Sequence, residues 1–98
     1  MNYRMMSFRV HPAEVPAVER AIIAFVAQVA DEPGTLRYES FREPDGVSCV
    51  HVMIFADDEA QARHAQTAHM KTFLADLYPR CEAEPVFTDL KKISGAGR

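Results

Sequence analysis

The sequence predicts an α+β domain with the element order β-α-β-β-α-β. Apolar residues recur at steps of three and four over residues 14–30, which is typical of an amphipathic helix. Residues 57–77 form a second helical segment, and β-forming runs flank both helices. Proline and glycine separate these segments. This order gives a four-stranded antiparallel sheet with two helices on one face.

The first half of the chain shows a strand followed by a helix. Residues 3–10 favour a strand that ends at His11, because a proline disfavours helix at the residue before it. The helix of residues 14–30 then carries one apolar stripe of Val15, Val18, Ile22, Phe25, Val26 and Val29. It ends where Pro33 and Gly34 interrupt the pattern.

The next two strands flank a turn at residues 43–46. Residues 35–42 alternate, with Leu36, Tyr38 and Ser40 expected on one side and Arg37, Glu39 and Phe41 on the other. Residues 47–55 are apolar on both faces, with Val50, Val52 and Ile54 opposite Cys49, His51, Met53 and Phe55. A strand of this kind is central and covered on both sides. Since the helices cover one face only, we expect a homodimer in which a second copy covers the other.

The second helical segment begins with acidic residues, where the helix dipole favours them. We expect it to break near Thr67, which could cap a new helical start. A last strand is expected over residues 85–93, followed by a flexible tail at residues 94–98. The whole chain, residues 1–98, is therefore one domain with its core at about residues 3–93.

Composition excludes several classes of protein. The chain has 98 residues, and 11 basic against 14 acidic residues leave a net charge of −3, which argues against binding nucleic acid through phosphate neutralisation. No apolar run is long enough to cross a membrane, and no signal peptide is visible. Cys49 and Cys81 lack the spacing of zinc or redox motifs. We expect a reduced, cytoplasmic protein.

Histidines are the most chemically suggestive residues, because they titrate near neutral pH. On an unbroken helix His64 and His69 would point roughly 140° apart. No metal-binding motif such as HExxH is visible, so we expect no metal. If Thr67 restarts the helix, His69 lies in its first turn, beside free backbone N–H groups. His69 is then the better candidate for handling protons, and a simple surface histidine is the alternative. His64 is the second candidate, with a backbone hydrogen bond as the simpler interpretation.

A set of strand and helix residues could line a pocket for a flat apolar ligand. His51 must be paired or point into a cavity if it faces the core. Tyr38 and His51 are the expected polar partners, and the expected apolar walls are Met53, Phe55, Met70 and Phe73. Methionine and aromatic residues at such spacing are also ordinary core residues.

Two segments resemble the antibiotic biosynthesis monooxygenase family. Residues 32–42, from Glu32 to Arg42, are similar to its "EPGxxxYxxxR" segment. Residues 55–73 are similar to its "W-x-[DE]-x-x-A…H-x-x-[ST]-x-H-[FM]-x-x-[FY]" segment, with Phe55 at the tryptophan position. The similarity extends over residues 8–93.

This resemblance implies a ferredoxin-like monomer that pairs sheet to sheet into a dimeric α/β barrel. It also implies a small enzyme that oxygenates a quinol- or anthrone-like aromatic with O₂ and with no metal, flavin or haem. Such chemistry needs a dry aromatic pocket, a base for the phenol proton and donors for developing negative charge.

Departures from the family pattern narrow the choice of branch. The family often has Trp where Phe55 stands and Glu where Met53 stands, and this chain has no Trp. The haem-degrading branch relies on a helix Trp and a downstream His, whose places are taken here by His64 and Leu74. The quinol monooxygenase-like branch is the closer match. A non-catalytic dimer that binds or senses small molecules is the alternative function.

Overall fold

The computed structural model describes residues 1–97, and its elements follow the predicted order with the second helical segment divided in two. The helices are α1 (Val15–Val29), α2 (Asp58–Gln66) and α3 (Ala68–Leu77). The strands are β1 (Asn2–Arg9), β2 (Thr35–Arg42), β3 (Ser48–Phe55) and β4 (Val86–Leu90). Two short 3₁₀ helices, η1 (Pro12–Glu14) and η2 (Tyr78–Arg80), precede α1 and follow α3.

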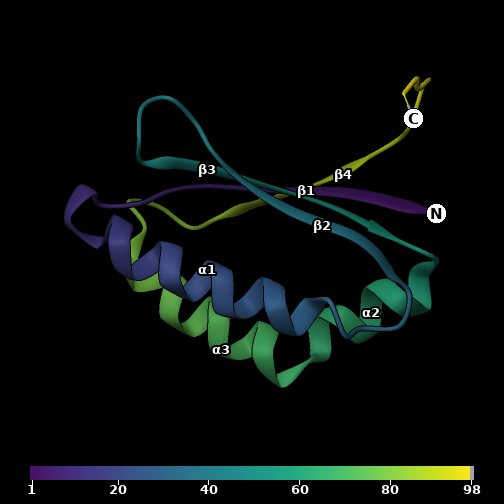
Figure 1. Ribbon diagram of the computed structural model, residues 1–98, viewed down its shortest axis with the longest axis horizontal. Helices are drawn as coiled ribbons and strands as arrows, with labels where there is room; N and C mark the ends of the chain where they lie inside the picture. Colours follow the sequence, from purple (N-terminus) through teal and green to yellow (C-terminus); the bar gives the residue numbers. More distant parts are fainter. Residues whose placement is uncertain (98) are drawn as a thin grey trace.

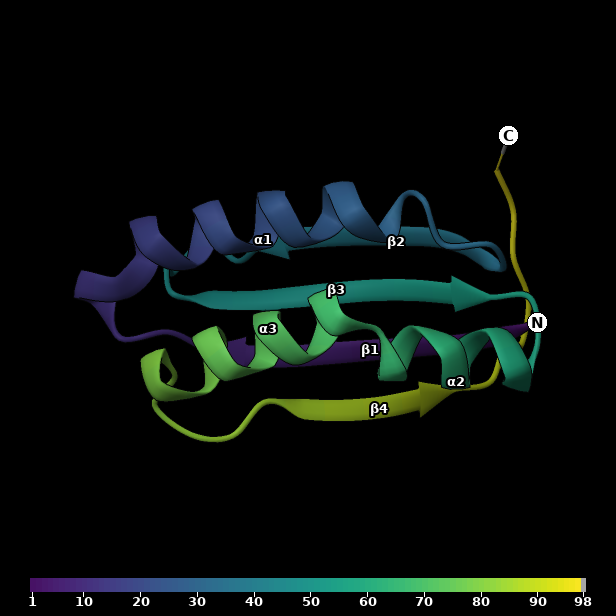
Figure 2. The same ribbon diagram turned by 90° about the horizontal axis from the view of Figure 1, so that it is seen from below.

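The four strands form one antiparallel sheet in the order β2-β3-β1-β4. All three helices lie on the same face of this sheet, as Figures 1 and 2 show. The topology is ferredoxin-like, which confirms the predicted fold class. Strand β3 lies between β2 and β1, as its apolar sequence predicts.

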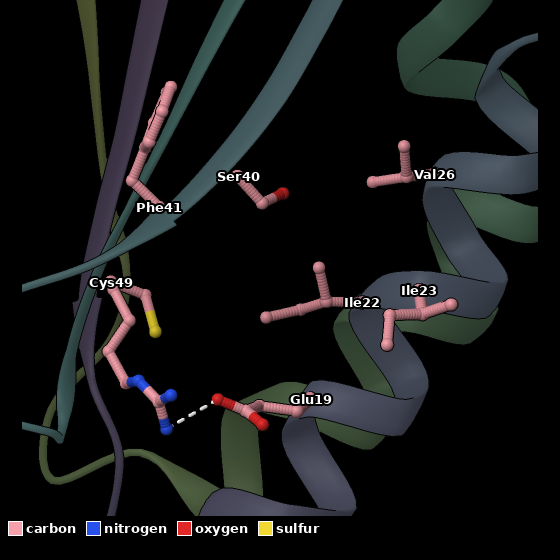
Figure 3. A pocket seen from close by; sticks show the side chains of 8 residues that line it. Glu19, Ile22, Ile23, Val26, Ser40, Phe41 and Cys49 are labelled. Atoms are coloured by element: carbon pink, nitrogen blue, oxygen red, sulfur yellow. Dashed lines mark ion pairs between the residues drawn. The ribbon is translucent and has the colours of Figure 1, made fainter.

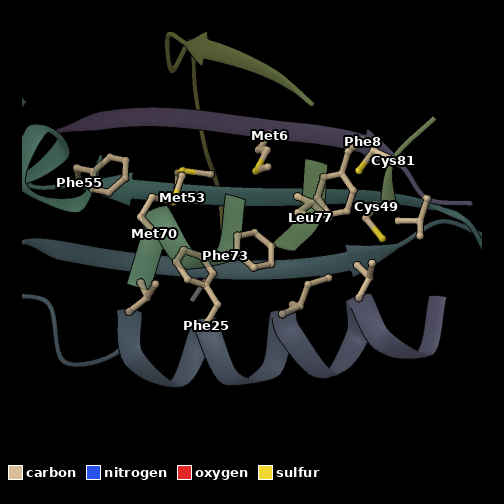
Figure 4. Packing of buried hydrophobic residues seen from close by; sticks show 14 of the residues in the cluster. Met6, Phe8, Phe25, Cys49, Met53, Phe55, Met70, Phe73, Leu77 and Cys81 are labelled. Carbon is tan, nitrogen blue, oxygen red and sulfur yellow. The ribbon is translucent and has the colours of Figure 1, made fainter. Parts of the chain in front are cut away.

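The core fills the space between the sheet and the helices. Alternate residues of β3 point toward the helices and are buried, which confirms the prediction that Cys49, His51, Met53 and Phe55 share one face. Phe25 of α1 stacks on Phe73 of α3 with ring centroids 4.4 Å apart. Figure 4 shows how side chains from α1, α3, β1 and β3 meet in this layer.

Two features of the strands differ from the prediction: a bulge in β2 and the end of β4. The register of β2 shifts between Thr35 and Arg37, so Leu36 is an extra residue that lies 56% exposed instead of sharing the inward side of Tyr38. A bulge of this kind cannot be read from simple alternation. The last strand ends at Leu90 and not at Ile93, because Leu90 already pairs with Tyr3 near the start of β1. Residues 91–97 form no helix or strand, and Arg98 of the predicted tail lies outside the described residues.

The predicted helix break at Thr67 is confirmed. Thr67 has an extended backbone and accepts a hydrogen bond from the backbone N–H of Met70 through its side-chain oxygen, so it caps α3. Its own hydroxyl donates to the carbonyl of His64 at the end of α2. One residue therefore ends α2 and starts α3.

Both the backbone conformation and the close packing require a glycine at position 34, in the turn before β2. Its φ of +89° lies in the left-handed region, and a Cβ there would stand 2.7 Å from the Cβ of Ala60. Gly34→Ala is expected to destabilise the fold by about 2–4 kcal/mol, because strain and overpacking add. Urea unfolding monitored by circular dichroism measures the loss.

Gly46 is the matched control for this change. Its φ is also positive, at +80°, but nothing lies within 4 Å of a Cβ built there. Gly46→Ala should cost only about 1–2 kcal/mol, the strain alone. Equal losses in the two variants would contradict the close packing of Gly34 against Ala60.

Candidate functional site

The carboxylate of Glu32 joins two histidines between the end of α1 and the α2–α3 junction. Its Oε1 lies 2.7 Å from Nδ1 of His64, and its Oε2 lies 2.5 Å from Nε2 of His69. The hydroxyl of Thr35 donates a third hydrogen bond to Oε1 at 2.8 Å. The Glu32 side chain is only 10% exposed, and those of His64 and His69 are 4% and 18% exposed.

The helix break brings the two histidines together. On a continuous helix their side chains would diverge by roughly 140°. Since Thr67 ends α2 and starts α3, His64 in the last turn of α2 and His69 in the first turn of α3 both reach Glu32. His64 therefore bonds a carboxylate and not the backbone group expected from its sequence position.

The carboxylate is held in its charged form. Burial by itself raises the pKa of Glu32, but the hydrogen bonds from His69, Thr35 and His64, with the charge of His64, outweigh it and lower the pKa below its ordinary value of 4.5. An ionised carboxylate accepts hydrogen bonds only. Both histidines must therefore donate an N–H to Glu32.

These hydrogen bonds determine which nitrogens are available for chemistry. A neutral His64 that donates its Nδ1–H has its acceptor at Nε2, and a neutral His69 that donates its Nε2–H has its acceptor at Nδ1. The Nε2 of His64 is buried and has no hydrogen-bond partner among the described residues. It lies in an aromatic setting, with the Phe55 ring 5.1 Å and the Tyr38 ring 5.7 Å from the imidazole centroid.

A second polar pair, Tyr38 and His51, lies beside the first. The Tyr38 hydroxyl is 2.7 Å from Nδ1 of His51, and their ring centroids are 5.4 Å apart. Burial lowers the pKa of His51 to about 4, and burial followed by the charge of Glu32 raises the pKa of Tyr38, so both are neutral at pH 7. Within residues 1–97, Nε2 of His51 has no hydrogen-bond partner either. His51 is thus both paired and left with one unused polar atom.

The apolar residues expected to line a pocket are core residues in this structure. Met53, Phe55, Met70 and Phe73 are each at most 5% exposed. Phe73 lies parallel to His51 at 5.9 Å, and Phe55 lies beside His64, so they do surround the two histidine pairs. None of the four lines either of the cavities described below.

One cavity reaches the Glu32 cluster from the surface. It measures about 340 Å³ and is lined by Glu32, Pro33, Ala60, Arg63, His64, Gln66 and Thr67.

In the part of the chain that the structure describes, no group of three or more His, Cys, Asp or Glu residues is placed to hold a metal ion. Likewise, no helix among residues 1–97 has the length and apolar character needed to cross a membrane.

Glu32 is the residue that sequence reasoning misses. The sequence places it in the turn that ends the first helix and in a family-like segment, and neither assigns it a partner. Its separation from His64 and His69 is more than 30 positions, so only the fold shows that they meet. A lone acidic residue next to a Pro–Gly turn is the one available signal.

Glu32→Gln is expected to reduce the loss of stability in acid. Because the folded-state pKa of Glu32 lies below 4.5, its contribution is present above that value and is lost as pH falls through the lower folded-state pKa. The urea midpoint should therefore fall less for the variant than for the wild type between about pH 5 and pH 3. Glu59→Gln, which changes an exposed carboxylate, is the control. Parallel curves for Glu32→Gln and the wild type would contradict the assignment.

Comparison with solved structures supports the fold. A protein from Nitrosomonas europaea named for antibiotic biosynthesis monooxygenases is 18% identical, with a TM-score of 0.90 over 96% of this chain and 100% of that one. A similarly named protein from Caulobacter crescentus is 24% identical, with a TM-score of 0.87 over 95% and 90%. A mutant of SnoaB, a cofactor-independent oxygenase from Streptomyces nogalater, is 19% identical, with a TM-score of 0.85 over 99% and 97%. No curated protein matches the chain.

The family itself follows from the sequence match. The family model described as antibiotic biosynthesis monooxygenase matches residues 1–76, which include all of β1, α1, β2, β3 and α2 and most of α3. Both segments that carry the resemblance lie inside this range. The chain belongs to the antibiotic biosynthesis monooxygenase family.

Proposed function

We propose that the protein is a cofactor-independent monooxygenase of the quinol monooxygenase-like branch, acting on a small quinol- or anthrone-like aromatic with O₂. The observation that carries this proposal is the Glu32 carboxylate shared by His64 and His69. It supplies a positioned base inside an aromatic layer, which is what oxygenation through a substrate anion requires. The free thiols of Cys49 and Cys81 agree with a reducing cytoplasm as the setting.

The three residues act as one proton-handling unit in this proposal. Nε2 of His64, which has no hydrogen-bond partner within residues 1–97, accepts the proton of the substrate, and Glu32 stabilises the imidazolium that forms. His69 is the more exposed of the two histidines and exchanges protons with water. The sequence favours His69 for the proton-accepting role, whereas this proposal gives that role to His64, and variants of the two histidines test the choice.

The oxygen chemistry then depends on the substrate. Loss of a proton makes an electron-rich anion, which passes electrons to O₂ and forms a C–O bond. For an anthrone, the methylene carbon becomes a carbonyl that keeps one oxygen atom, and its two hydrogens leave with the other oxygen as water. The unused Nε2 of His51, beside Tyr38, is a polar group that could hold the oxygen-bearing end of the substrate.

The substrate ring is proposed to contact the residues around the two pairs. Tyr38 and His51 provide the polar contacts, and the apolar contacts come from Met53, Phe55, Met70 and Phe73. These four are packed in the core, so substrate entry requires side-chain rearrangement. Methionine is suited to this, because its unbranched side chain adapts to irregular spaces.

A homodimer is the proposed assembly. The face of the sheet away from the helices carries apolar residues that no helix covers, among them Met5, Val50, Val52, Ile54, Val86 and Leu90. Clusters of apolar side chains on an open sheet face are typical of protein–protein interfaces. Pairing with the same face of a second copy buries both and forms the dimeric α/β barrel that the family resemblance implies.

Oxygen uptake tests the proposed activity. With a panel of hydroquinones and anthrones, the wild type should consume O₂ faster than the spontaneous rate measured without protein. His69→Ala and His64→Ala should each lower turnover by at least about tenfold, because a general base contributes 10²–10⁴-fold. His11→Ala, a change at an exposed histidine far along the chain from the site, is the matched control.

Added imidazole separates the two histidines. His69 is 18% exposed and His64 is 4% exposed, so imidazole should restore more of the turnover of His69→Ala than of His64→Ala. Thermal unfolding shows whether each variant is folded. Unchanged turnover in His69→Ala removes it from the mechanism. Saturable binding of panel compounds without any uptake would instead support the non-catalytic binding dimer.

The dimer has its own test. Light scattering at about 10 μM should give twice the mass of the chain, as expected for a face-to-face interface of standard size. Val52→Glu, on the uncovered face of β3, should give monomers, because it buries a charge at the interface. Gln28→Glu, on the exposed surface of α1, should remain a dimer. A monomeric wild type would rule out the sheet-to-sheet assembly.

A further inference from the structure

A second cavity, separate from the Glu32 cluster, lies between α1 and the sheet. It measures about 380 Å³, and its lining residues are Ile22, Ile23 and Val26 from α1, Ser40 and Phe41 from β2, and Cys49 from β3, with Glu19 and Arg42 at one end. Figure 3 shows Ile22 and Val26 projecting from α1 toward β2, and Ser40 projecting from β2 toward α1. Neither Glu32 nor either of its histidine partners lines it.

The walls of this cavity are mostly apolar and its rim is exposed. Ile23 of α1 is 70% exposed, although it is a large hydrophobic residue. The cavity thus combines an apolar slot between two layers with an apolar mouth open to solvent. A cavity of 150 Å³ accommodates benzene, so about 380 Å³ has room for roughly two fused rings.

Ser40 gives this cavity an unused polar group. Its Oγ is buried and has no hydrogen-bond partner among the described residues. A buried hydroxyl without a partner is costly, and a ligand that bonds it recovers that cost. In the sheet register Ser40 pairs with His51, whose Nε2 is also unpartnered, so two unsatisfied groups lie on neighbouring strands.

An ion pair marks one end of the cavity. Nη1 of Arg42 lies 2.5 Å from Oε1 of Glu19, and both side chains are close to half exposed. The pair connects the end of β2 to α1. An exposed ion pair of this kind is weak, so another carboxylate can replace Glu19 as the partner of Arg42. Arginine suits that role, because its planar group binds carboxylates in a bidentate manner.

We propose that this cavity is a binding site for a fused-ring aromatic carboxylate. The rings lie in the slot between Ile22 and Val26 on one side and the sheet on the other, and the acid group pairs with Arg42. This site does not depend on the proposed oxygenase activity, because it uses none of the Glu32 cluster.

Calorimetry with 2-naphthoate and its neutral methyl ester tests the site. Both probes should bind the wild type, the acid more tightly. Arg42→Gln should weaken naphthoate binding about fivefold, and Glu19→Gln should strengthen it about twofold, because it removes the competing carboxylate. The ester should bind all three proteins within about twofold, since it carries no charge. Arg9→Gln, in an exposed ion pair with Glu82, is the matched control.

Two further measurements locate the site. Amide resonances of Ile22, Val26 and Ser40 should shift on addition of naphthoate, and Val26→Phe, which fills the slot, should abolish binding of both probes. Circular dichroism confirms that the variant is folded. Failure of both probes to bind the wild type overturns the proposal, and so does an equal response of naphthoate to Arg42→Gln and Arg9→Gln. Tighter binding of decanoate than of naphthoate would overturn the choice of an aromatic ligand.

Discussion

The carboxylate of Glu32 is the interaction on which this part of the molecule depends. It receives hydrogen bonds from the start of β2, the end of α2 and the start of α3, through Thr35, His64 and His69. A nearly buried charge is tolerated only where it is paired and hydrogen-bonded. Gly34 allows this arrangement, because its missing side chain lets the turn approach Ala60 of α2. The turn, the carboxylate and the helix break are therefore one structural unit.

Several polar side chains lie in the core between the sheet and the helices. The stability of the fold alone does not explain why they are there. Tyr38 and His51 satisfy one another, yet the buried His51 and His64 each have one nitrogen that finds no partner among the residues the structure describes. Aromatic rings, including those of Phe25 and Phe73, pack around both pairs. An apolar core of the same shape would avoid these costs. Each such group calls for a physical explanation, such as a catalytic role or an ordered water or ion.

Sequence patterns predict the fold well and the site in part. Periodicity, alternation and the Thr67 cap predict every major element, because these signals are local. The bulge at Leu36 and the early end of β4 depend on pairing with other strands, which no local pattern reports. His69, His64, Tyr38 and His51 stand out by residue type and position. Glu32 does not, because its partners are distant in sequence and its own segment is explained by a turn.

The double role of Thr67 has a consequence for local opening of the fold. Helix α2 buries only Ala60 and His64, whereas α3 buries Met70, Phe73 and Leu77. Regions with few buried apolar contacts open at lower free energy than the core. Since the helical hydrogen-bond pattern is interrupted at Thr67, we expect α2 to open at a lower free energy than α3. His64, which hydrogen-bonds Glu32 from α2, would then leave together with that helix. Water would reach the Glu32 carboxylate, so the hydration of this carboxylate would report partial unfolding of the fold.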